Sequence, residues 1–142
     1  MKTILRYVAA LVVGVAIGML VNISLVNLGP RIIPLPEGAD VSTMEGLKES
    51  IKLYQPAHFL FPFLGHAVGT LVGAFLVALL AGSHAMRFAL AVGCFFLFGG
   101  ISMVVMVGGP LWFILADLIL AYLPMGYLGG VSAAAVQRAL KA

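Results

Sequence analysis

Few residues in this chain have side chains that could do chemistry, and most of these lie inside apolar segments. Charged residues make up 9% of the 142 residues, with three histidines and one cysteine. Asp117 is the most informative, because a carboxylate near the centre of a membrane-spanning helix costs about 2.5–3.5 kcal/mol on insertion scales. Such a residue is rarely present without a partner or a purpose.

Four polar side chains from four apolar segments are predicted to lie at similar depth. Measured from the segment ends that we place outside, Asn22, Ser102 and Asp117 lie at about 8–10 Å, since a helix rises about 1.5 Å per residue. His66 lies at about 14 Å. One interpretation is a pocket open to the outside, where Asp117 and His66 bind a small polar or cationic ligand or relay a proton. The other is an interhelical clasp, in which the four side chains satisfy one another.

One face of the second apolar segment gathers further polar residues. His58, His66 and several glycines fall within an arc of about 100° on an ideal helix, and Thr70 follows His66 by one turn. We therefore add Thr70 and His58 to the candidates for ligand binding or proton relay. The full candidate set is Asp117, His66, Asn22, Ser102, Thr70 and His58.

The spacing of these residues does not predict a metal site or a catalytic centre. His58 and His66 are eight residues apart, about 12 Å along a helix, too far to share an ion bound at about 2.1 Å. His66 with Asp117 supplies two ligands, fewer than a catalytic zinc usually has. The same spacing argues against a bis-histidine haem unless another protomer contributes a histidine. Because no nucleophile–base pair stands out, we expect no catalytic residue and no cofactor, and favour a non-enzyme.

The composition places the chain in a membrane. Hydrophobic residues make up 63% of it and the mean hydropathy is +1.16, whereas a soluble domain averages about 45–50% apolar residues. The lipid bilayer is the solvent that accepts this surface. A net charge of only +3 without a basic cluster argues against a nucleic-acid partner. The lone Cys94 forms no intrachain disulfide.

Four apolar segments are each long enough to cross a hydrocarbon core of about 30 Å. The first is too long for a signal-peptide core and lacks a cleavage site, so we interpret it as an uncleaved span. Short links after the second and third segments predict antiparallel neighbours. We therefore expect one all-α membrane domain over 1–142, an up-down-up-down bundle of four transmembrane helices. The predicted spans are about 4–28, 57–81, 88–107 and 111–131, with a tail to 142.

The only sizeable segment outside these spans is the connector over 29–56. It opens with Gly29 and Pro30, which predict the end of the preceding helix. A Ser-Thr-Met-Glu sequence at 42–45 predicts a capping box that opens an amphipathic helix over about 42–54. We expect this helix to lie flat on the outer surface, as a tethered connector or as a lid. Its apolar stripe consists of Met44, Leu47, Ile51 and Tyr54.

Basic residues predict the orientation. Five would lie on the side of the N-terminus and three on the other: Lys2, Arg6, Arg87, Arg138 and Lys141 against Arg31, Lys48 and Lys52. We therefore predict a multi-pass cell-membrane protein with cytoplasmic termini and an extracytoplasmic connector 29–56. Tyr54, Trp112 and Tyr122 are interpreted as aromatic anchors at the interface, a role also open to His58.

Small residues four positions apart predict close helix packing of the GxxxG type, because burial alone does not drive association in lipid. Gly126 and Gly130 share a face nearly opposite to that of Asp117, which predicts a second packing surface toward another protomer or a membrane-protein partner. The predicted packing residues are Gly14, Gly18, Gly65, Gly69, Gly73, Gly126 and Gly130.

Three classes of function remain open from the sequence. The first is a transport, channel or ligand-binding protein that uses the polar layer. The second is a membrane scaffold or interaction subunit whose buried polar residues are a structural clasp. The third is an intramembrane enzyme or a lipid- or quinone-binding protein, with Phe95, Phe96 and Phe98 as candidate lining of a groove.

Overall fold

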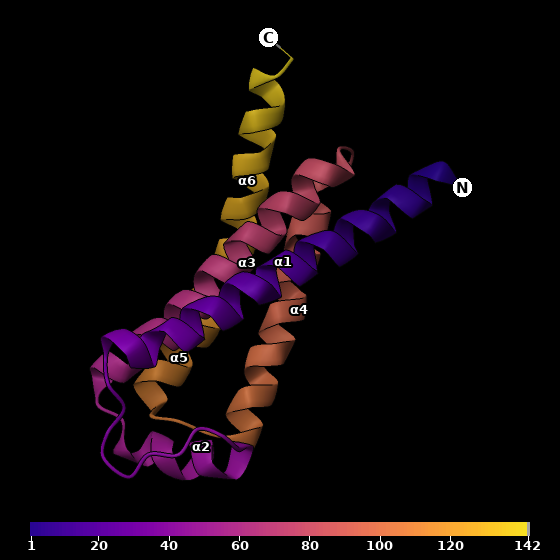
Figure 1. The fold of residues 1–142 in the computed structure, drawn as a ribbon. Coiled ribbons are helices and arrows are strands. Elements are labelled where there is room, and N and C mark those ends of the chain that lie inside the picture. Colours follow the sequence, from indigo (N-terminus) through magenta and orange to yellow (C-terminus); the bar gives the residue numbers. More distant parts are fainter. Residues whose placement is uncertain (142) are drawn as a thin grey trace.

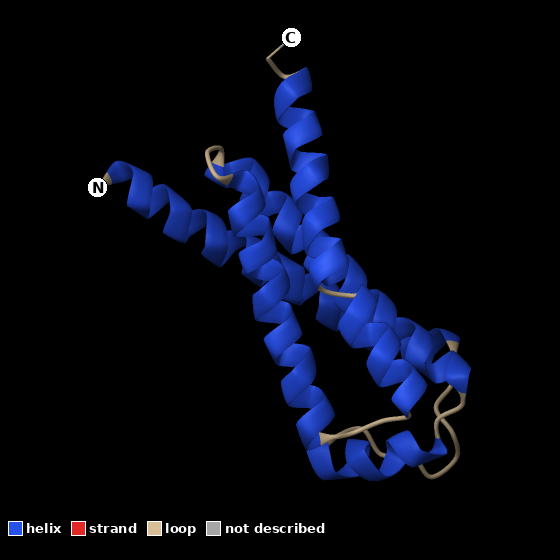
Figure 2. Cartoon of the chain, turned by 180° about the vertical axis from the view of Figure 1, so that it is seen from behind, coloured by secondary structure: helices blue, strands red, loops and turns tan. Residues whose placement is uncertain are grey.

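The computed structural model describes residues 1–141, apart from the side chain of Lys2. This part of the chain consists of helices and loops, without a β-strand (Figure 2). Four helical segments are long and apolar enough to cross a membrane, which confirms the predicted all-α class with four apolar helices. These segments are Thr3–Ile32, Pro56–Ala81, Ala85–Met106 and Leu111–Ala139.

The central helix of the fold is α3, which packs against α1, α4 and α6. Both termini lie at one end of the molecule and α2 lies at the other (Figure 1). Ala74, Val77 and Ala78 of α3 have no exposed surface, so the core follows this helix. The helices are α1 (Lys2–Ile32), α2 (Met44–Ser50), α3 (Leu60–Ala81), α4 (Ala85–Met106), α5 (Leu111–Leu120) and α6 (Leu123–Ala139).

Glycines bring the backbones of α1 and α3 into contact. A Cβ atom added to Gly18 would lie 2.7 Å from the carbonyl oxygen of Gly69, and one added to Gly14 would lie 2.8 Å from that of Gly73. Real Cβ atoms essentially never approach other atoms so closely. Larger residues at these positions would therefore push the two helices apart.

The glycines of α6 pack within the same chain. A Cβ atom on Gly126 would lie 3.2 Å from the Cα atom of Gly93, and one on Gly130 would lie 2.8 Å from the sulfur of Met86. Both neighbours belong to α4. The face that we assigned to a second protomer or a partner is therefore occupied by the chain's own helix.

Helix α1 continues through Gly29 and Pro30 to Ile32, so the predicted helix end at these residues is wrong. Proline lacks an N–H group and removes one hydrogen bond to the preceding turn. The N–H group of Ile33 closes the helix by donating to the carbonyl of Gly29 at 2.8 Å.

The amphipathic helix predicted over about 42–54 is present as α2 followed directly by the 3-10 helix η1 (Ile51–Leu53), and the chain before α2 folds back against its end. Thr43, not the predicted Ser42, caps α2 by accepting from the N–H group of Gly46 at 2.9 Å. The Ser42 hydroxyl donates to Asp40 at 2.6 Å, and this bond lowers the pKa of the Asp40 carboxyl, as does the bond from the Ser42 N–H group. The buried Ser50 hydroxyl accepts from the Asp40 N–H group and donates to its carbonyl. These bonds tie the two halves of the connector together.

The fourth apolar segment is broken, although the sequence predicted one continuous helix. α5 ends at Leu120 and α6 begins at Leu123. Pro124 lies in the first turn of α6, where it has no N–H group to donate backwards and disfavours helical backbone in the preceding residue. Tyr122 at the break is only 1% exposed, so it is a core residue rather than the predicted interfacial anchor.

We predict that Gly18→Ala lowers stability by about 1–3 kcal/mol, because its methyl group would overlap the backbone of α3. Gly99→Ala is the matched control, since a Cβ atom there meets nothing within 4 Å. Thermal unfolding of the purified protein in lipid nanodiscs measures both. Equal stability of the two variants would show that the contact between α1 and α3 does not require glycine.

Candidate functional site

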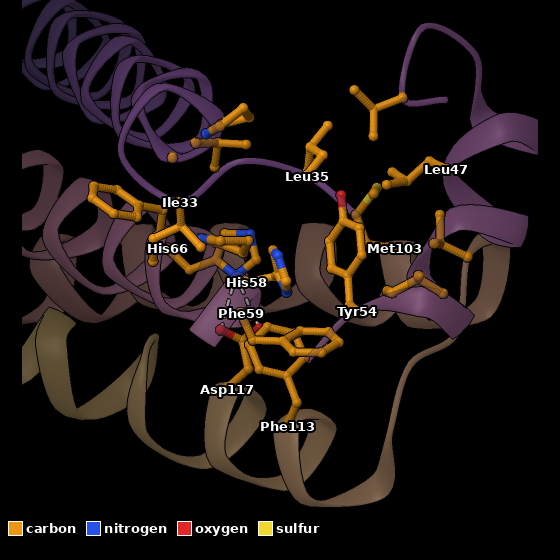
Figure 3. A pocket seen from close by; sticks show the side chains of 18 of the residues that line it. Ile33, Leu35, Leu47, Tyr54, His58, Phe59, His66, Met103, Phe113 and Asp117 are labelled. Carbon is orange, nitrogen blue, oxygen red and sulfur yellow. Dashed lines mark hydrogen bonds and ion pairs between the residues drawn. The ribbon is translucent and has the colours of Figure 1, made fainter. Parts of the chain in front are cut away.

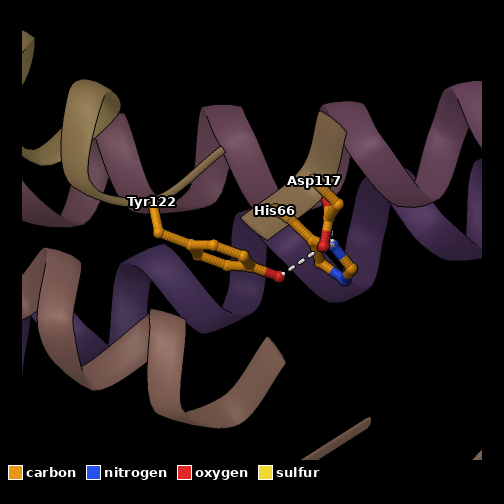
Figure 4. A network of polar contacts seen from close by, with 3 residues as sticks. All are labelled: His66, Asp117 and Tyr122. Carbon is orange, nitrogen blue, oxygen red and sulfur yellow. Dashed lines mark hydrogen bonds and ion pairs between the residues drawn. The ribbon is translucent and has the colours of Figure 1, made fainter. Parts of the chain in front are cut away.

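A network of three side chains joins α3 to the broken fourth segment. His66 of α3 contacts Asp117 of α5 through its Nδ1 atom, at 2.8 Å from Oδ1 and 3.0 Å from Oδ2. The Tyr122 hydroxyl donates to Oδ2 at 2.8 Å (Figure 4). Asp117 is 3% exposed. The buried carboxylate thus has two side-chain partners, which offset much of its desolvation.

The break between α5 and α6 makes this network possible. In a continuous helix, residues five positions apart would not face each other closely, but the break turns the Tyr122 ring back toward Asp117. The ring lies against Gly100 of α4, where any side chain would collide with it, and it stacks on His66 with ring centroids 5.7 Å apart. Sequence reasoning missed Tyr122, although Pro124 close behind Asp117 was a signal of the break.

A cavity of about 280 Å³ adjoins the network on the side of α2. Its wall is formed by the ends of α1 and α4 nearest the connector, by the connector itself, and by α3 and α5. Apolar side chains provide most of this wall, and His66 and Asp117 lie at its inner end (Figure 3). Leu47, Ile51 and Tyr54 of the predicted amphipathic stripe line the cavity, whereas Met44 does not.

His66 is the member of the network that faces the cavity. Its side chain is 20% exposed, against 5% for Asp117. The Nδ1 atom is bound to Asp117, and no described protein group forms a hydrogen bond with Nε2. A carboxylate bound to one ring nitrogen orients the imidazole and fixes which nitrogen it presents. The imidazole therefore presents one ring nitrogen, Nε2, to the cavity in a fixed orientation.

His58 belongs to the cavity wall but is held by the connector. Its Nδ1 atom accepts from the N–H group of Gln55 at 3.0 Å, and Nε2 lies 3.0 Å from the carbonyl oxygen of Pro34. Tyr54 lines the same wall, and burial raises the pKa of its hydroxyl. At neutral pH the tyrosine hydroxyl is thus protonated and uncharged. Tyr54 therefore gives the wall a polar edge without adding a charge.

The remaining predicted site residues do not join the network. The Ser102 hydroxyl donates to the carbonyl of Phe98 in its own helix at 2.8 Å. Asn22 packs against Gly65 and Gly69 and has no side-chain hydrogen bond to the described residues. Thr70 is fully buried and its hydroxyl has no partner in the described chain. The predicted layer of four side chains therefore reduces to one pair, His66 and Asp117, completed by Tyr122.

In the described part of the chain, no three His, Cys, Asp or Glu side chains are grouped so that they could hold a metal ion. The site offers one buried carboxylate, one oriented imidazole and an apolar space beside them. This arrangement can bind a small molecule through a hydrogen bond, and its imidazole is the group that could accept or release a proton.

No protein-family model, curated protein or solved structure matches this chain. Function is therefore inferred from the site itself.

We predict that Tyr122→Phe destabilises the protein by about 1–3 kcal/mol, because it leaves a buried carboxylate oxygen with one donor fewer. Tyr127→Phe in α6 is the control, since Tyr127 is 55% exposed and makes no side-chain hydrogen bond to the described residues. Thermal unfolding compares the two. A Tyr122→Phe variant as stable as Tyr127→Phe would show that the hydroxyl does not stabilise Asp117.

Proposed function

We propose that the protein is a four-span membrane protein that binds a small molecule in the cavity between the connector and the His66–Asp117 pair. The four long apolar helices support membrane insertion. Because the termini lie at the end opposite to α2 (Figure 1), the chain would cross the membrane in an up-down-up-down order. Both termini would then be cytoplasmic, as the basic residues predict, and the connector extracytoplasmic.

The observation that carries the binding proposal is the position of a partly exposed polar residue in an apolar cavity. A clasp with a purely structural role would be expected to satisfy its polar groups and to exclude space beside them. Here His66 keeps one nitrogen without a partner in the described chain, next to about 280 Å³ of space. Binding pockets typically combine such an apolar wall with a few placed polar groups.

The composition of the cavity wall also indicates which kind of ligand would fit. The sequence suggested a small polar or cationic ligand, but most of the wall is apolar. A mostly apolar molecule with one polar group matches this wall better. Binding is favoured over transport because α3 is tightly packed beyond the site, where Ala74, Val77 and Ala78 have no exposed surface.

Cysteine labelling tests the proposed orientation. In a Cys94→Ala background, Glu37→Cys in the connector should react with a membrane-impermeant maleimide on intact cells. Lys141→Cys near the C-terminus should react only after permeabilisation. The opposite pattern would reverse the orientation, and labelling of both from outside would rule out the odd number of spans that we propose between these two positions.

Adjacent valines of α4 test the cavity. Val104 lines it, whereas Val105 is 80% exposed. We predict that Val104→Phe fills the space and abolishes retention of a small molecule by the protein purified from its own membranes, measured by native mass spectrometry. Val105→Phe should retain the molecule at the wild-type level. Retention by both variants would place the molecule elsewhere, and its absence from the wild-type protein would count against the proposal.

A further inference from the structure

We propose that the cavity selects a neutral, hydroxylated single-ring aromatic compound, such as a phenol or a hydroquinone head group, whose hydroxyl bonds to Nε2 of His66. This inference rests on the proposed function and specifies its ligand. It follows from three properties of the site. These are the hydrogen-bonding capacity of Nε2, the lack of a charged side chain that could pair with a charged ligand, and the aromatic residues of the wall.

The hydrogen bonds around Asp117 determine what Nε2 can do. Asp117 accepts from the Tyr122 hydroxyl and contacts Nδ1 of His66 with both oxygens, as an ionised carboxylate does. The proton of a neutral His66 ring is then on Nδ1, and Nε2 presents a lone pair. A second proton on the ring would turn Nε2 into a donor. A hydroxyl group can donate in the first state and accept in the second, so it matches the site in both.

Charged ligands fit the site poorly. Asp117 is buried and already has two partners, so it offers little surface to a cation. Among the described residues, no lysine or arginine lines the cavity to pair with an anion. A charged group in this apolar space would lose its hydration without full compensation. An ammonium group could also only donate and a carboxylate only accept, whereas a hydroxyl is neutral and does both.

The aromatic residues of the wall favour a ring. Phe59 lies with its ring centroid 4.6 Å from that of Phe113 and 5.6 Å from that of Tyr54, and all three line the cavity (Figure 3). Aromatic rings attract one another in offset and edge-to-face arrangements. An apolar cavity of about 150 Å³ is enough for benzene, so about 280 Å³ accommodates one ring with a short substituent.

A pair of probes that differ only in the hydroxyl tests this assignment. The probes are 4-butylphenol and its methyl ether, 4-butylanisole, titrated against the protein in nanodiscs. Trp112 is the only tryptophan and lies 5.4 Å from Phe59 between ring centroids, so its fluorescence reports on the cavity. Wild type should bind the phenol about fivefold to tenfold more tightly, the effect of one hydrogen bond.

Two variants assign the preference to His66. His66→Phe should bind both probes equally, whereas Ser102→Ala, which alters a hydroxyl bound within its own helix, should keep the preference for the phenol. The comparison of the two probes in the wild-type protein remains decisive even if His66→Phe does not fold. A preference that persists in a folded His66→Phe protein would overturn the role of this residue.

The outcomes separate this inference from the proposed function. Equal binding of the phenol and the ether by the wild type, with loss of both in Val104→Phe, would overturn the hydroxyl assignment and keep the cavity as a binding site. Tighter binding of 4-butylbenzylamine or 4-butylbenzoate would overturn the neutral class. If no probe binds and no small molecule is retained from the native membranes, both proposals fail.

Discussion

The structure depends on one physical constraint: the buried carboxylate of Asp117 needs hydrogen-bond donors. Asp117 lies in the most apolar part of the chain, and a carboxylate there is tolerated only with hydrogen-bond partners. His66 and Tyr122 meet that need from two different elements. To bring them together, α3 must pass close to α5, and the fourth segment must break after Leu120. The cavity then lies beside His66, the side chain of the network that is partly exposed.

Glycines set how closely the supporting helices can approach. The contact between α1 and α3 holds one side of α3, and the contact between α4 and α6 holds Tyr122 against Gly100. In lipid, such close backbone contact replaces the hydrophobic drive of a soluble core. The close glycine contacts therefore hold the helices together, whereas the space beside His66 is left unfilled by side chains.

Much of the fold, but less of the site, could be predicted from the sequence. Apolar runs define the four long helices, and the spacing of Leu47, Ile51 and Tyr54 indicated the stripe of the connector that faces the cavity. Depth along a helix singled out Asp117 and His66, but depth alone does not show in which direction around the helix axis a side chain points. Ser102 lies at similar depth yet bonds within its own helix. The role of Tyr122 does not follow from the sequence, because a tyrosine in an apolar run usually marks an interface and the apolar run continues past Pro124 without showing the break.

The broken fourth segment has a consequence for how the protein is made. α5 has ten residues, about 15 Å of helix, which is half the thickness of a hydrocarbon core. A piece of this length that carries a carboxylate is a poor candidate for independent insertion. In chain order, however, α3 is synthesised first, so His66 is already in place when Asp117 emerges. In the membrane insertion that we propose, the acidic residue of α5 would thus meet a partner from a helix synthesised before it.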